Sequence, residues 1–97
     1  GMVFVFTLQM ARMDANEKLI LMDKILHELE DAKNTETYIV KKLSDLESKN
    51  SALGDRLLEQ KLSEIFNFID DALTATIGLH VEYKQMRNRF AKDNELN

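Results

Sequence analysis

The sequence predicts an all-α protein, an antiparallel hairpin of two long helices at about 14–49 and 55–92 that dimerises into a four-helix bundle. Three observations predict this fold. Proline is absent and there are only three glycines in 97 residues, so little interrupts a helix. Two stretches repeat apolar side chains at gaps of three and four residues, which keeps one stripe of a helix facing a partner. A polar segment containing a glycine separates the two stretches.

The first residues are not counted in the predicted fold. Gly1 resembles the residue that tag removal leaves behind. Residues 2–8 are apolar, but they are too few to cross a bilayer and lack the basic start and cleavage site of a signal peptide. We therefore treat residues 1–13 as an N-terminal segment and residues 14–97 as a single helical-hairpin domain. Three closely spaced methionines are candidates for the natural start, Met2, Met10 and Met13.

The first helix has a marked start. Asp14 can accept hydrogen bonds from the first turn while Glu17 reaches back to it, an acidic form of the capping box. Residues 33–37 are polar and poor helix formers, which suggests a kink, a short break or a polar layer inside the bundle. Because no proline or glycine lies there, we expect one continuous helix with a weak middle. The first apolar repeat, with Glu36 as its mismatch, is Met22, Ile25, Leu29, Ala32, Glu36, Ile39, Leu43 and Leu46.

A turn is expected within residues 47–55, the strongest punctuation in the chain. Asn50 or Gly54 can adopt the left-handed conformation that ends a helix, and Ser51 or Asp55 can cap the next one. The second apolar repeat begins one residue out of phase with the first, and a turn between them removes this conflict. We expect each repeat to face the chain's other helix. The second repeat is Leu58, Leu62, Ile65, Ile69, Ala72, Thr76, Leu79, Tyr83, Met86 and Phe90.

The apolar stripes are wider than one contact between two helices requires. A hairpin has no third layer, and each large apolar side chain left in water forgoes about 1.5–3 kcal/mol of burial. A second copy of the chain is therefore the expected partner, and an unidentified protein is expected to bind the apolar surface left over. Phe68 and Val81, on other faces, are the candidate contacts. The additional apolar residues beside the two repeats are Leu19, Leu26, Val40, Phe66, Leu73 and Ile77.

Composition disfavours several functional classes. A net charge of −4 and a pI near 5.1 disfavour general nucleic-acid binding and attraction to an anionic membrane. The absence of cysteine excludes disulfides, thiolate metal sites and a cysteine nucleophile, and it fits the reducing cytoplasm where we expect the protein. No phosphate-binding loop or nucleophile motif is present, so we expect no enzymatic activity and no cofactor.

One alternative is a small Rop-like helical dimer that binds RNA or DNA, an analogy of architecture alone. It would use the basic end of the second helix, where Lys84, Arg87, Arg89 and Lys92 carry no acid among them. Cations there also suit the negative end of the helix dipole, and these four spread over more than half of the helix circumference. We therefore rank this function below protein interaction.

A second alternative is a metal or small-molecule binder in the bundle. His27 has three carboxylates within reach on its own helix, although a solvated acidic patch around an exposed histidine is the favoured explanation. The second histidine, His80, has no such neighbours along its helix. The small residues between Thr74 and Gly78 suggest a close helix crossing rather than a ligand cavity. The leading hypothesis remains a non-enzymatic helical interaction protein.

Overall fold

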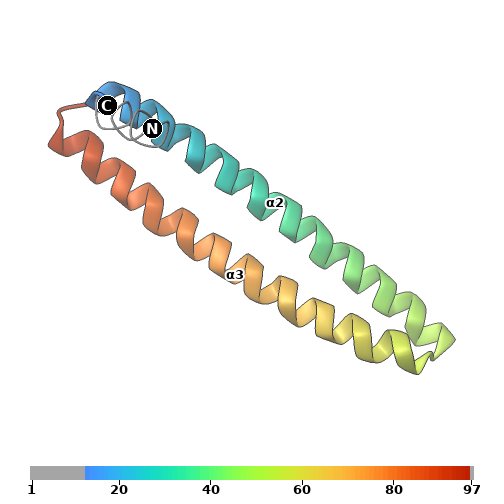
Figure 1. Ribbon diagram of the computed structural model, residues 1–97. Helices are drawn as coiled ribbons and strands as arrows, with labels where there is room; N and C mark the ends of the chain where they lie inside the picture. Colours follow the sequence, from blue (N-terminus) through green and yellow to red (C-terminus); the bar gives the residue numbers. More distant parts are fainter. Residues whose placement is uncertain (1–12, 97) are drawn as a thin grey trace, which may run out of the picture.

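The computed structural model describes residues 13–96, which form two long antiparallel helices joined by a tight turn (Figure 1). Helix α2 spans Ala15–Leu53 and helix α3 spans Arg56–Asp93, and the two lie side by side along the hairpin. The described residues include no strand. The predicted all-α hairpin is confirmed. Of the N-terminal segment 1–13, only Met13 lies within the described residues.

Helix α2 begins and continues as the sequence predicts. The Glu17 N–H donates to Asp14 Oδ1 at 2.8 Å, so Asp14 caps the first turn. The helix runs without a break through residues 33–37, which confirms one continuous helix. There, the hydroxyls of Thr35 and Thr37 donate to carbonyl oxygens four residues earlier, at 3.0 and 2.8 Å. These local bonds occupy the threonine hydroxyls without interrupting the helix.

The turn is made by Gly54 and Asp55. Gly54 has φ 72° and donates its N–H to Asn50 O, which ends α2, while Asp55 Oδ1 accepts from the Leu58 N–H at 2.9 Å and caps α3. Asn50 stays helical and buried, and its amide bonds both the N–H and the carbonyl of Asp55, at 3.0 and 2.9 Å. Because Asn50 holds the turn with its side chain instead of ending the helix, α2 continues four residues beyond the predicted 49 to Leu53.

Replacing Gly54 by Ala should lower the free energy of unfolding by about 1 kcal/mol, because a Cβ is strained at positive φ even where space is open. The matched control is Gly78→Ala in α3, where a Cβ also meets nothing within 4 Å. That change should raise stability by about 0.5–1 kcal/mol, the helix-propensity difference. Urea unfolding at one fixed chain concentration measures both effects. Equal responses at the two glycines would contradict this description of the turn.

The core of the hairpin is thin. Among residues 13–96, the buried apolar side chains are Leu19, Leu43, Leu62 and Ala91, and no large side chain is fully buried. Two helices share a single line of contact, so they cover one strip of each other and leave the rest in water. A chain of this size with so small a core gains little stability from its own packing.

The line of contact differs from the one expected. The prediction that each apolar repeat faces the chain's other helix as a whole is wrong, because Ile65, Leu79 and Met86 remain 47%, 50% and 55% exposed. A helix pair uses about two of every seven positions on each helix. Each helix contacts the other through one half of its apolar repeat and through residues beside that repeat. The other half of the repeat faces away from the line of contact. By their burial together with their spacing, the apolar residues assigned to this contact are Leu19, Met22, Leu26, Leu29, Val40, Leu43, Leu62, Phe66, Ile69, Leu73, Tyr83 and Phe90.

Candidate interaction surface

One side of the hairpin carries a row of apolar side chains on each helix, spaced seven residues apart. A seven-residue spacing returns to nearly the same side of a helix, so each row is continuous along its length. We call the two rows together the apolar face. Its residues are Ile25, Ala32, Ile39, Leu46 and Leu53 on α2, and Leu58, Ile65, Ala72, Leu79 and Met86 on α3.

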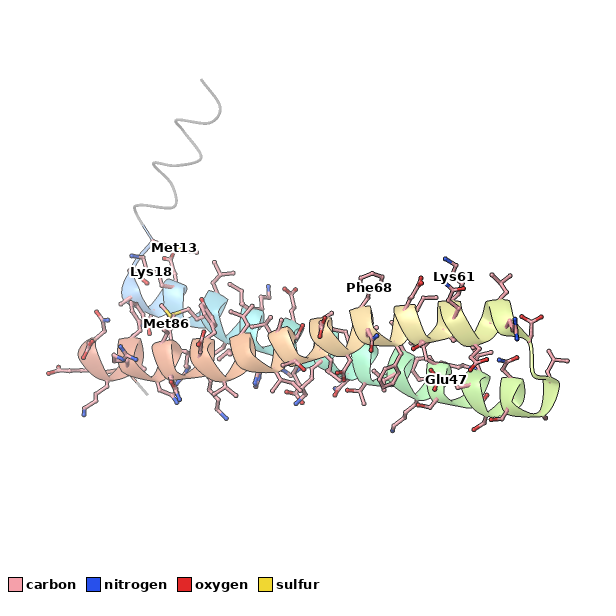
Figure 2. All side chains as sticks on the ribbon, turned by 90° about the horizontal axis from the view of Figure 1, so that it is seen from below. Met13, Lys18, Glu47, Lys61, Phe68 and Met86 are labelled. Carbon is pink, nitrogen blue, oxygen red and sulfur yellow. The ribbon has the colours of Figure 1, made fainter. Side chains whose placement is uncertain are left out.

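The two rows lie on the same side of the hairpin. At the open end, Ile25 and Met86 line one shallow apolar groove together with Met13 and Lys18. Figure 2 shows Met13 and Lys18 on the side from which Phe68 and Lys61 of α3 also project. Three contacts between the helices fix their register and place residue 39 level with 72 and residue 46 level with 65. These contacts are Asp23–Arg87, Glu30–His80 and Glu36–Thr76.

The apolar face is too continuous to be ordinary surface. Single exposed leucines are common on folded proteins and need no explanation. Here, however, the exposed side chains adjoin one another along both helices, from the groove at the open end to Leu53, which is 72% exposed beside the turn. Contiguous exposed apolar surface is typical of sites that bind another protein, a membrane or a ligand. The apolar face is therefore the candidate interaction surface.

A polar pair interrupts the middle of the hairpin. Thr76 Oγ1 donates to Glu36 Oε1 at 2.8 Å, which joins the two mismatched positions of the apolar repeats across the helices. The other carboxylate oxygen, Glu36 Oε2, is buried without a hydrogen-bond partner within the described hairpin. This pair forms a polar layer between the two helices of the hairpin. Because a buried oxygen without a donor costs free energy, this layer is maintained at the expense of stability.

The opposite side of the hairpin is held by ion pairs. Arg87 Nε and Nη2 donate to the two carboxylate oxygens of Asp23, at 2.6 and 3.2 Å. This bond from Arg87 lowers the pKa of Asp23. Glu30 lies 3.1 Å from Lys33 Nζ and 3.5 Å from His80 Nε2. The hydrogen bond from Lys33 lowers the pKa of Glu30, and the nearby positive charges add to this effect. The ion pairs between the helices thus lie on the side away from the apolar face, where Ile77 and Val81 are also exposed.

The basic residues of the nucleic-acid alternative are not gathered into one surface. Arg87 is engaged with Asp23, and Lys84 lines a shallow groove that also contains Asp23 and Glu30. Arg89 and Lys92 are exposed and, from their spacing, face other directions around α3. Phosphate binding needs cations that act together on one side. The four basic side chains instead point in different directions around α3, so they do not form one cationic surface.

The two histidines, on different helices, line one groove, which the sequence did not indicate. His27 and His80 line the same shallow groove, and His80, rather than His27, contacts Glu30. The carboxylates near His27 in the sequence suggested a contact within its own helix. The contact in the structure is instead between His80 and Glu30, which are 50 positions apart. Across residues 13–96, no cluster of three histidine, aspartate or glutamate side chains has the geometry to hold a metal ion.

The predicted protein-contact residues are exposed but do not share a surface. Phe68 is 74% exposed beside the apolar face, and Val81 is 49% exposed. Thirteen residues of helix turn Val81 to the opposite side of α3, so the two side chains do not act together. The close crossing expected near Gly78 is not made by the chain's own other helix, because a Cβ added there would meet nothing within 4 Å.

Asp23→Asn should lower the thermal midpoint of unfolding at pH 7, and this difference should shrink as the pH falls toward 2. Pairing with Arg87 lowers the pKa of Asp23 below its ordinary value of 3.8, so the folded state favours the ionised form. That stability is complete above pH 3.8 and is lost as the pH falls through the lower folded pKa. Asp71→Asn, at an exposed site on α3, controls for the change in charge. A difference that persists undiminished at pH 2 would contradict the ion pair.

No helix among residues 13–96 is long and apolar enough to span a membrane. Comparison of the chain with models of protein families, with characterised proteins and with solved structures gives no significant match.

Proposed function

We propose that this chain is a non-enzymatic protein-interaction module that works as a homodimer. In the dimer, the apolar faces of two hairpins pack together into a four-helix bundle. The observation that carries the proposal is the apolar face, which runs the length of a hairpin whose own core contains only a few buried side chains. A second copy supplies a surface of matching length and chemistry, so one interaction covers the whole face.

The free energy of dimer formation is expected to be favourable and moderate in size. Residues such as Ile65 and Leu79 are about half exposed in the single hairpin, so covering each contributes about 1 kcal/mol. Each contact occurs twice in a symmetric dimer. Association has its own cost in lost freedom of motion, about 4–15 kcal/mol. We therefore expect a dimer at micromolar concentration rather than an extremely tight complex.

The role in the cell that suits such a dimer is that of an adaptor, which binds another protein through the apolar surface left at the margin and on the outside of the bundle. Phe68 is the leading contact, because it is the most exposed of the large apolar side chains in the described residues and borders the apolar face. Val81, on the opposite side of α3, stays at the surface of the dimer. These two contacts belong to different surfaces of the assembly.

Sedimentation equilibrium over a range of micromolar concentrations tests the homodimer. The expected mass is twice the 11.2 kDa of the chain. A single 11.2 kDa species throughout that range would overturn the proposal. For the adaptor role, Phe68→Ser should weaken capture of a partner by the intact dimer, while Ser63→Ala on the same helix should leave it unchanged.

The two alternatives have less support. In the Rop-like alternative, two of the four basic residues are poorly placed for phosphate, because Arg87 is paired with Asp23 and Lys84 lines a groove with Asp23 and Glu30. Retention of the protein on a nucleic-acid column at physiological salt would reverse this ranking. A metal-binding role has only the contact between His80 and Glu30 in its favour, and metal analysis of the purified protein tests it.

A further inference from the structure

The charged residues among those that border the apolar face decide how a second copy can lie on it. On each helix, an edge row follows the outer margin of the face, four residues before each face residue on α2 and three residues after it on α3. The rows come within reach of a partner packed on the face, as flanking positions do in helical bundles. The α2 edge is Leu21, Glu28, Thr35, Lys42 and Lys49, and the α3 edge is Lys61, Phe68, Ala75, Glu82 and Arg89.

Two symmetric arrangements bring the faces together. If the turns of both hairpins lie at the same end, α2 packs along α3 of the partner. If the turns lie at opposite ends, each helix packs antiparallel against its own copy. In both arrangements neighbouring helices are antiparallel, so the helix dipoles do not distinguish them. The charges on the edge rows do.

With both turns at the same end, like charges meet. The register of the hairpin places Glu28 level with residue 82 and Lys49 level with residue 61. Glu28 then faces the partner's Glu82, and Lys49 faces the partner's Lys61. Each of these repulsive pairs occurs twice because of the two-fold symmetry. Facing like charges disfavour an interface.

With the turns at opposite ends, the strongest edge contact becomes attractive. Full overlap of the two hairpins centres the two-fold axis near Thr35, the middle of Ala15–Leu53. Glu28 then faces the partner's Lys42, also twice. One kind of repulsive pair remains, between Lys61 and the partner's Arg89, and it also occurs twice. This arrangement has fewer like-charge contacts and gains opposite-charge contacts that the other lacks.

The same overlap also suits the interior of the face. Ile39 lies opposite the partner's Ala32, and Leu79 lies opposite the partner's Ala72, so these two large side chains each meet a small one. With the turns at the same end Ile39 would meet the partner's Ala72, so this packing suits both arrangements and the edge charges distinguish them. The layer of Glu36 and Thr76 comes to the middle of the dimer. A shift by seven residues would instead bring Glu36 toward the partner's Leu43, and a buried acid against a leucine disfavours that register.

We propose that two copies of this chain pair with their turns at opposite ends, α2 on α2 and α3 on α3, with Glu28 beside the partner's Lys42. The proposal rests on the homodimer proposed above and names its geometry. It predicts that Thr35 and Ala75, both exposed in the single hairpin, each lie next to the same residue of the partner.

Cysteine cross-linking tests this geometry cleanly, because the chain contains no native cysteine. Thr35→Cys alone and Ala75→Cys alone should each give a disulfide-linked dimer under mild oxidation, since both positions adjoin the two-fold axis. Asn34→Cys, exposed on the far side of α2, should remain uncross-linked as the control. With turns at the same end, only a mixture of the Thr35→Cys and Ala75→Cys chains would cross-link.

Sedimentation of the reduced variants separates the two possible failures. Cross-linking only in the mixture, or a dimer that cross-links in none of these variants, would overturn the geometry and leave the homodimer standing. A monomer in sedimentation would overturn the homodimer itself. The expected result is a dimer in which each single variant cross-links to itself.

Charge reversal gives a second test, because the two arrangements predict opposite changes in the dissociation constant of the dimer. Glu28→Lys should raise the dissociation constant of the dimer about threefold to tenfold, because two attractive pairs become repulsive. Adding Lys42→Glu should restore it. With turns at the same end, Glu28→Lys would instead relieve repulsion from the partner's Glu82 and tighten the dimer. Tighter association of the single variant would therefore overturn the proposed geometry.

Discussion

Leu79→Glu is expected to convert the dimer to a monomer, with a dissociation constant raised on the order of 100-fold or more. Leu79 lies on the apolar face and is 50% exposed in the single hairpin. The substitution removes two apolar contacts from the dimer and forces two carboxylates either to lose their hydration or to separate the helices. Because the side chain is half exposed in the hairpin, the helices should persist, and circular dichroism should still report a helical chain.

The matched control is Val81→Glu. Val81 is 49% exposed and lies two residues further along the same helix, but it points away from the apolar face. This variant introduces the same charge at nearly the same exposure and should remain a dimer in sedimentation equilibrium. If both variants became monomeric, or if Val81→Glu alone did, the assignment of the interface to the apolar face would be contradicted.

The second large effect is expected at the polar layer of Glu36 and Thr76. There, a single substitution should lower the free energy of unfolding, and a double substitution should raise it. Thr76→Val removes the hydrogen bond to Glu36 and leaves a carboxylate with both oxygens unpaired, which should lower the free energy of unfolding by about 1–3 kcal/mol. Adding Glu36→Leu removes the unpaired acid as well. The double variant should be more stable than the natural chain, by about 1–4 kcal/mol, as found when buried ionic groups give way to apolar packing.

Thr74→Val provides the control for this pair, because Thr74 is an exposed threonine on the same helix and should respond by no more than about 0.5 kcal/mol. Chemical unfolding at a fixed chain concentration compares the four proteins. A double variant less stable than Thr76→Val alone would show that the Glu36 side chain contributes stability, contrary to the description of this layer.

The sequence was sufficient where the determining interactions are local. The cap at Asp14 and the glycine turn depend on residues within a few positions of one another, so their chemistry is readable along the chain. Of the two candidate caps for α3, the structure uses Asp55 and leaves Ser51 within α2. That choice follows from the side chain of Asn50, which reaches forward to the turn.

The sequence was insufficient where the answer depends on which side of a helix faces its neighbour. Ile65 and Phe66 are both large and apolar, and each is followed seven residues later by another apolar residue, Ala72 or Leu73. Only the folded hairpin shows that Phe66 faces α2 while Ile65 faces outward. The pair of Asp23 and Arg87, 64 positions apart, likewise depends on the location of the turn.

The most direct test of the central claim is an isotope-filtered nuclear Overhauser experiment on a dimer mixed from labelled and unlabelled chains. Signals that pass between copies should involve the methyl groups of Ile39, Ile65 and Leu79 on the apolar face and should be absent at Val81. Contacts between copies at Val81 but not at the face, or no such contacts in a sample shown to be dimeric, would contradict the account.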